Sequence, residues 1–124
     1  MPANLKILLA EDSPVIQRMI SATLSRDGHL VEAVGDGSQA VEAVRAGSFD
    51  LVLMDLRMPV MDGLAATRAI RALDVPQPHI VALSGDHDAE TSQACLDAGM
   101  NGHLTKPIVP SDMAAVIAKV SAGL

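Results

Sequence analysis

The stretch that decides the fold is LVLMDLRMPVMDG, residues 51–63. An apolar run ends on the carboxylate of Asp55, and a loop follows that Pro59 stiffens and Gly63 closes. Open α/β sheets hold their chemistry at the carboxyl ends of their strands. The stretch therefore predicts a buried strand over residues 50–54, with Asp55 as a reactive group at its end.

The rest of the chain repeats this alternation of strand and helix. Further strands are predicted at residues 6–10, 29–34, 79–84 and 102–105. Helices are predicted from the Ser13-Pro14 start to Gly28, at 38–46 with Ser38 as its cap, at 64–73, at 89–98, and from Pro110 onward. Asp62-Gly63 is interpreted as a turn only. Such alternation predicts a doubly wound α/β fold, a five-stranded parallel sheet of flavodoxin-like order 2-1-3-4-5, in one domain over residues 1–124.

Composition narrows the class of protein. The chain is 49% hydrophobic and 19% charged, as expected for a soluble globular domain. A net charge of −6 argues against nucleic-acid binding, and the single aromatic residue, Phe49, provides no surface for base stacking. No apolar run approaches the roughly 18 residues of a membrane span, and no leader pattern opens the chain. We therefore expect a cytoplasmic domain without membrane contact.

Polar side chains end four of the five predicted strands. Glu11-Asp12 follows the first, Asp55 the third, Ser84 the fourth and Lys106 the fifth. Carboxyl ends of parallel strands meet at one sheet edge, so these groups are expected to converge. Three close carboxylates repel one another unless a cation relieves them, and Mg²⁺ suits oxygen ligands beside a phosphate.

With the metal bound, Asp55 is predicted to attack a phosphorus atom while charge on the phosphoryl oxygens is neutralised. Lys106 adds a second positive charge, and the Ser84 hydroxyl adds a hydrogen bond. Gly85 lacks a side chain and offers space and a backbone N–H. Each residue alone has an ordinary structural explanation, as a solvated charge or a turn cap. Their joint occurrence in strand order favours the site. His87, among acids in the loop 85–88, is a minor alternative zinc ligand.

These residues, with Pro107 after Lys106, give the chain a pattern that resembles the receiver domains of two-component response regulators over essentially all 124 residues. The resemblance implies that Asp55 takes a phosphoryl group from a phosphohistidine. It implies a Mg²⁺ site made by Asp12, Asp55 and the main-chain carbonyl of Arg57, with Glu11 acting through water.

The resemblance also implies how the phosphoryl group is sensed. Lys106 would pair with it, Ser84 would turn toward it, and the Lys106–Pro107 peptide would be cis. His103 occupies the family's switch position, which is usually Tyr or Phe, and Ser84 lacks the methyl group of the commoner Thr. The resemblance is strongest to receivers of hybrid sensor kinases or to single-domain regulators. It implies a sensor histidine kinase or a histidine phosphotransfer protein as partner, and a monomer or weak dimer.

Three other functions are weighed against a phosphoacceptor domain that is not a turnover enzyme. A phosphatase of the haloacid-dehalogenase type would have an acid two residues after its nucleophile, where this chain has Arg57, and would need a cap domain. A nucleotide-binding module would need a phosphate loop, and residues 99–102 lack its Gly-Lys-Ser/Thr ending. A pseudo-receiver usually lacks one of the site residues, and here all are present.

Overall fold

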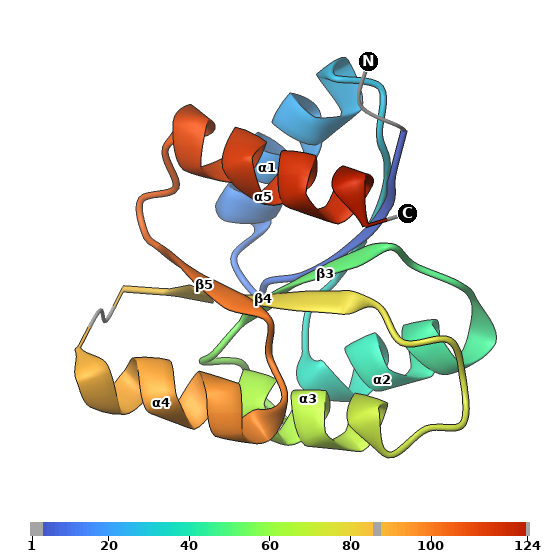
Figure 1. Cartoon of the computed structure of the whole chain (residues 1–124), viewed down its shortest axis with the longest axis vertical. Helices are drawn as coiled ribbons and strands as arrows, with labels where there is room; N and C mark the ends of the chain where they lie inside the picture. The colour runs from blue at the N-terminus through green and yellow to red at the C-terminus, as the bar shows by residue number, and fades with distance from the viewer. Residues whose placement is uncertain (1–3, 86–87, 124) are drawn as a thin grey trace.

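Five strands and five helices alternate along the chain, as the sequence predicts (Figure 1). The computed structural model describes residues 4–85 and 88–123. The strands are β1 (Lys6–Ala10), β2 (Leu30–Val34), β3 (Leu51–Asp55), β4 (His79–Ser84) and β5 (Gly102–Thr105). The helices are α1 (Pro14–Arg26), α2 (Gly37–Ala46), α3 (Gly63–Arg71), α4 (Ala89–Ala98) and α5 (Pro110–Ala122). The predicted loop 85–88, including the alternative zinc ligand His87, lies partly outside the described residues.

The sheet is entirely parallel in the order β2-β1-β3-β4-β5, which confirms the predicted topology. Helices α1 and α5 cover one face, and α2, α3 and α4 cover the other (Figure 1). Every residue of β3 is buried, as its unbroken apolar sequence predicts. None of the helices within the described residues has the length and apolar character to cross a membrane.

The two-residue period of a strand decides which side chains can meet at the sheet's carboxyl edge. The layer beneath α1 and α5 includes Leu9, Leu53 and Leu104. Two residues after each of these leucines comes a residue of the site: Glu11 after Leu9, Asp55 after Leu53 and Lys106 after Leu104. Because side chains alternate along a strand, we expect these three side chains to lie on the same face as the leucines. Backbone pairing extends past the strand ends, with Glu11 N–H bonded to Val34 and Lys106 N–H to Ser84.

Several predicted boundaries are wrong by one or two residues, for local hydrogen-bonding reasons. The cap of α2 is Asp36 and not Ser38, because the Asp36 carboxylate accepts the Gln39 N–H at 2.8 Å. β2 begins at Leu30, since the His29 N–H still bonds back to Leu24 at the end of α1. β3 is displaced by one residue and includes Asp55, which pairs with Leu83 of β4.

The interpretation of Asp62-Gly63 as a turn only is also wrong. Asp62 caps α3, its carboxylate accepting the Ala65 N–H at 2.8 Å, and Gly63 is the first helical residue. A Cβ placed on Gly63 would lie 2.2 Å from the backbone oxygen of Asp55 and 3.0 Å from the Leu56 Cα. Only glycine allows α3 to begin this close to the end of β3, so the absence of a side chain at Gly63 permits the observed backbone position of Asp55.

Replacing Gly63 by alanine should therefore destabilise the protein. We expect Gly63→Ala to lower the free energy of unfolding by about 1–3 kcal/mol. The added methyl group would clash with backbone atoms, which cannot move aside as a flexible side chain can. Urea denaturation measures this difference. Gly85→Ala is the matched control, since a Cβ on Gly85 meets no atom within 4 Å, and its unfolding free energy should stay within about 1 kcal/mol of wild type. Equal effects of the two substitutions would contradict the close approach at Gly63.

Candidate functional site

Three carboxylates meet at the carboxyl edge of the sheet. Glu11 and Asp12 follow β1, and Asp55 ends β3, the neighbouring strand. One oxygen from each lies within 4.8 Å of the others. Glu11 and Asp55 are buried, whereas Asp12 is exposed. The sequence prediction that these acids converge is therefore confirmed.

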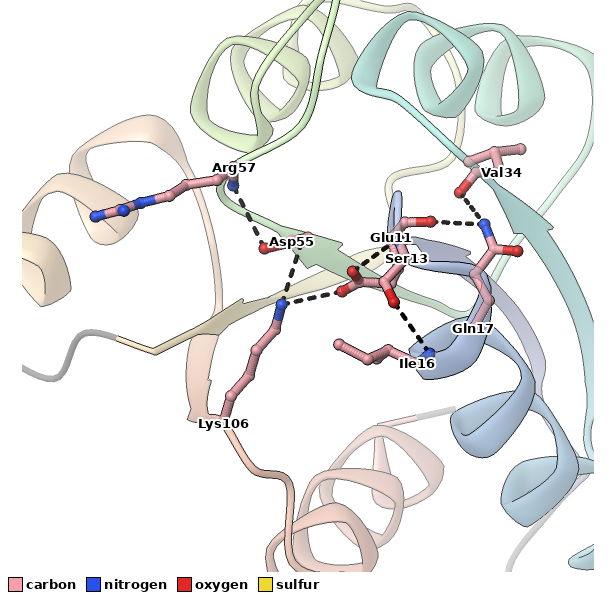
Figure 2. Close-up of polar contacts among 8 residues, drawn as sticks. All are labelled: Glu11, Ser13, Ile16, Gln17, Val34, Asp55, Arg57 and Lys106. Carbon is pink, nitrogen blue, oxygen red and sulfur yellow. Dashed lines mark hydrogen bonds and ion pairs between the residues drawn. The ribbon is translucent and has the colours of Figure 1, made fainter.

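Lys106 enters this cluster from the end of β5 (Figure 2). Its Nζ lies 3.0 Å from Glu11 Oε2 and 3.2 Å from Asp55 Oδ2. The ammonium thus bridges two carboxylates from different strands, and its alkyl stem crosses the end of β4 to reach them. The peptide from Lys106 to Pro107 is cis, as expected.

Backbone N–H groups hold the remaining carboxylate oxygens. Asp55 Oδ1 accepts the Arg57 N–H at 3.4 Å, and Glu11 Oε1 accepts the Ser13 N–H at 3.1 Å (Figure 2). Ser13 in turn caps α1, its hydroxyl accepting the Ile16 N–H at 3.4 Å. Both buried acids therefore have one oxygen on a backbone donor and the other on Lys106.

Burial and charge oppose one another at this site. Burial raises the pKa of the Glu11 carboxyl, and the negative charge of Asp55 adds to the rise, against hydrogen bonds from Lys106 and Ser13 that lower the pKa. Burial alone would lower the pKa of the Lys106 ammonium. Its hydrogen bonds and charge interactions with Glu11 and Asp55 outweigh burial and raise that pKa above its usual value. Lys106 is therefore a permanent cation in the cluster.

A pocket of about 160 Å³ opens beside Asp55. Its walls are Asp55, Leu56, Arg57, Ser84, Gly85 and Lys106. At roughly 30 Å³ for a water molecule, this space is large enough for a group of several heavy atoms. Ser84 is buried in the wall and Gly85 lies exposed at the rim. Half-buried His103 lies on the edge strand β5, where it pairs with Ala82 of β4, and is not part of this wall.

The donor set fits a magnesium ion. Three carboxylates against the single ammonium of Lys106 leave a net charge of −2 in a partly buried cluster, and all the side-chain atoms that could coordinate a metal there are hard oxygens. A small divalent cation is the species that such a set prefers. Asp55 and Lys106 belong both to this cluster and to the walls of the pocket, so an anionic group placed there would lie near the Lys106 ammonium.

Two residues of the site were missed in the sequence. At Gly63, an Asp-Gly pair before an apolar helix fits both a turn and a cap followed by a first helical residue, and the structure has the second arrangement. Gln17 was not singled out, yet its side chain reaches back to the end of β1 (Figure 2). Its partners are backbone carbonyls, which carry no sequence signature, so only the structure identifies it.

Comparisons with known proteins agree with the geometry. Residues 7–118 match the family model of the response regulator receiver domain. The chain is 41% identical over 120 residues to hybrid signal transduction histidine kinase B of Dictyostelium discoideum, a match that covers 87% of this chain and 6% of that kinase. The chain thus spans a small fraction of the length of the curated relatives it matches.

Solved structures give the same result. The receiver domain of sensor histidine kinase PA1611 from Pseudomonas aeruginosa PAO1, which has a magnesium ion coordinated in its active-site cleft, matches with a TM-score of 0.88 at 39% identity. This match covers 97% of this chain and 99% of that one. The Ssk1 receiver of Saccharomyces cerevisiae, solved with the histidine phosphotransfer protein Ypd1, has the same fold, with a TM-score of 0.91 at 23% identity over 98% of this chain and 92% of that one.

The electrostatics of the site predict how Glu11 titrates. In EDTA the pKa of Glu11 should lie above its ordinary 4.5, and Lys106→Met should raise it further, because the hydrogen bond from Lys106 is the strongest effect that opposes burial. Side-chain carboxyl NMR measures both midpoints. Lys119→Met, on the exposed side of α5, is the control and should leave the midpoint unchanged.

The same shift fixes the sign of a pH dependence of stability. Because the folded-state pKa of Glu11 is raised, its contribution to stability is fully present below pH 4.5 and is lost as the pH rises through the folded-state value. The free energy of unfolding of wild type relative to Glu11→Gln should therefore decline across that window. A Glu11 midpoint at or below 4.5 would contradict this description of the site.

Proposed function

The chain belongs to the response regulator receiver domain family, and from this premise we propose that Asp55 is the residue that accepts the phosphoryl group. A receiver is a signalling domain of two-component phosphorelays and not a turnover enzyme. The observation that carries the proposal is the position of Asp55, buried at the end of β3, paired with Lys106 at 3.2 Å and forming with it part of the pocket wall. We propose further that residues 1–124 act as one receiver domain, alone or as part of a hybrid kinase.

We propose that phosphoryl transfer proceeds from a phosphohistidine of the partner. One oxygen of the Asp55 carboxylate forms the new bond to phosphorus as the bond from phosphorus to the imidazole nitrogen breaks. The electron pair of that bond returns to the imidazole, and the product is an aspartyl phosphate. Loss of water around buried Asp55 favours attack, while the charge of Lys106 3.2 Å away stabilises the oxygens of the group in transfer.

Glu11, Asp12, Asp55 and the main-chain carbonyl of Arg57 would hold Mg²⁺ in this account, Glu11 through water. The metal would supply neutralising charge to the phosphoryl oxygens. Arg57 is suited to its role because its backbone already lies against Asp55, through the N–H that Asp55 Oδ1 accepts.

The remaining assignments concern recognition of the phosphoryl group. In our proposal the Ser84 hydroxyl and the Gly85 N–H donate hydrogen bonds to the group, and Ser84 with His103 transmits its presence to β5 and its neighbours. Ser84 and Gly85 both line the pocket at Asp55. His103 would act from within β5, the strand that Lys106 directly follows.

Replacing the acceptor tests this function directly. With phosphoramidate as a small phosphoryl donor and Mg²⁺ present, wild type should incorporate one hydroxylamine-sensitive phosphoryl group per chain. Asp55→Asn should incorporate none, because an amide oxygen is a poor nucleophile. Asp97→Asn, an exposed change on α4, is the matched control and should be labelled as wild type. Intact-protein mass spectrometry gives the count, and retained labelling of Asp55→Asn would refute the assignment.

We propose a sensor histidine kinase or a histidine phosphotransfer protein as the partner, with this domain acting as a monomer or weak dimer. ATP-dependent kinases of this kind work in the cytoplasm, where we place the domain. An apolar groove between α1 and the segment after β5 leads to the site, starting at Lys106 and lined by Ile16, Met19, Ile20, Pro107 and Ile108. Met19 is 65% exposed. A partner helix that presents its histidine beside apolar side chains fits this groove.

A charge in the groove should separate docking from chemistry. We expect Met19→Glu to slow transfer from a phosphorylated histidine phosphotransfer protein at least tenfold, because the partner would have to bury a carboxylate. Labelling by phosphoramidate needs no docking and should be unchanged. Leu96→Glu, at a similarly exposed apolar position on α4 (57%), is the control. Equal transfer rates for the two variants would place the docking surface elsewhere.

A further inference from the structure

The side chain of Gln17 joins α1 to the ends of two strands. Its Nε2 donates to the backbone carbonyl of Glu11 at 2.6 Å and to that of Val34 at 3.0 Å (Figure 2). A carboxamide nitrogen has two hydrogens to donate, and here both are used. Gln17 is half-buried in the second turn of α1, so the bonds are formed from a rigid element.

These bonds complete the fixation of the Glu11 backbone. The Glu11 N–H already donates to the Val34 carbonyl at 3.1 Å, as the last step of the pairing between β1 and β2. The Glu11 carbonyl lies beyond the last residue of β1, where the chain leaves the sheet for α1. Gln17 supplies the donor for this carbonyl, so the residue is held at its N–H and at its C=O.

The peptide group that Gln17 holds is the one that joins Glu11 to Asp12. Its orientation sets the direction in which the chain leaves for Asp12, and hence where the Asp12 side chain points. In the structure, one carboxylate oxygen of Glu11, one of Asp12 and one of Asp55 lie within 4.8 Å of one another, and this spacing depends on the direction of the chain at Asp12. Because a peptide group is planar, a rotation at the Glu11 carbonyl displaces Asp12 as a unit.

We propose that Gln17 is a positioning residue for the magnesium site, acting through the Glu11–Asp12 peptide without touching the metal. The inference rests on the proposed magnesium-dependent function of the site. Groups that orient metal ligands typically change metal affinity 10- to 100-fold when removed. The start of α1 has its own support in the Ser13 cap and Pro14, so helix formation does not depend on Gln17 alone.

The test replaces the donor by a side chain of the same length. Gln17→Met keeps the unbranched chain and removes both hydrogens, and Gln93→Met, on exposed α4 with its amide bonded to Asp97 of the same helix, is the matched control. The Mg²⁺ dissociation constant of the full chain is measured by NMR titration. We expect an increase of at least tenfold for Gln17→Met and no change for Gln93→Met.

A readout without metal accompanies the titration. In EDTA, amide hydrogen exchange at Ser13, whose N–H is bonded to Glu11 Oε1, should be faster in Gln17→Met than in wild type. If Gln17→Met is partly unfolded, Gln17→Asn decides the point. Its amide is one methylene too short to reach both carbonyls, and it should show the same direction of change in a folded protein.

The outcomes separate the inference from its premise. A Gln17 variant that is folded and binds Mg²⁺ within twofold of wild type overturns the positioning role, even if its thermal stability is reduced. A wild-type protein that binds no Mg²⁺ overturns the proposed function of the site, and the inference with it. A variant that binds Mg²⁺ more weakly, but is labelled normally by phosphoramidate once Mg²⁺ is saturating, supports a positioning role for Gln17 over a direct role in the chemistry.

Discussion

Three carboxylates come close together at one edge of the sheet, and their mutual repulsion must be balanced by the surrounding structure. Two unit charges 4.8 Å apart repel by about 3 kcal/mol at an effective dielectric constant of roughly 20. Burial of Glu11 and Asp55 adds the cost of lost hydration. Lys106 offsets part of this, with contacts of 3.0 and 3.2 Å. The remaining negative charge explains why a cation belongs at the site.

The fold maintains this arrangement through the placement of its strands and through contacts with backbone atoms. Adjacent β1 and β3 bring the acids together, and the alternation of side chains directs Glu11, Asp55 and Lys106 to one face. Gly63 lets α3 begin directly against the Asp55 carbonyl. Gln17 ties the Glu11 carbonyl to α1. A site whose oxygens must lie within a few tenths of an ångström of their places is thus built on rigid elements.

The fold and the convergence of the acids with Lys106 could be predicted from the sequence, because parallel strands bring their carboxyl ends to one edge and each of these residues ends a strand. Family membership also removes the phosphatase alternative, which the position of Arg57 already disfavoured. The caps at Asp36 and Asp62 were decided only by the structure, since Ser38 competes with Asp36 and the Asp62-Gly63 pair fits both a turn and a helix start. Gln17 was missed because its partners are main-chain atoms 6 and 17 residues away.

Thermal unfolding in a Mg²⁺ titration at constant ionic strength would show whether the excess negative charge of Glu11, Asp12 and Asp55 forms a magnesium site. A ligand bound only by the folded protein stabilises it by about 2.7 kcal/mol at a hundred times its dissociation constant. We expect the midpoint of unfolding to rise steadily with the logarithm of the Mg²⁺ concentration above that constant. A midpoint of unfolding that rises no more with Mg²⁺ than with KCl of matched ionic strength would show that these three carboxylates do not form a magnesium site.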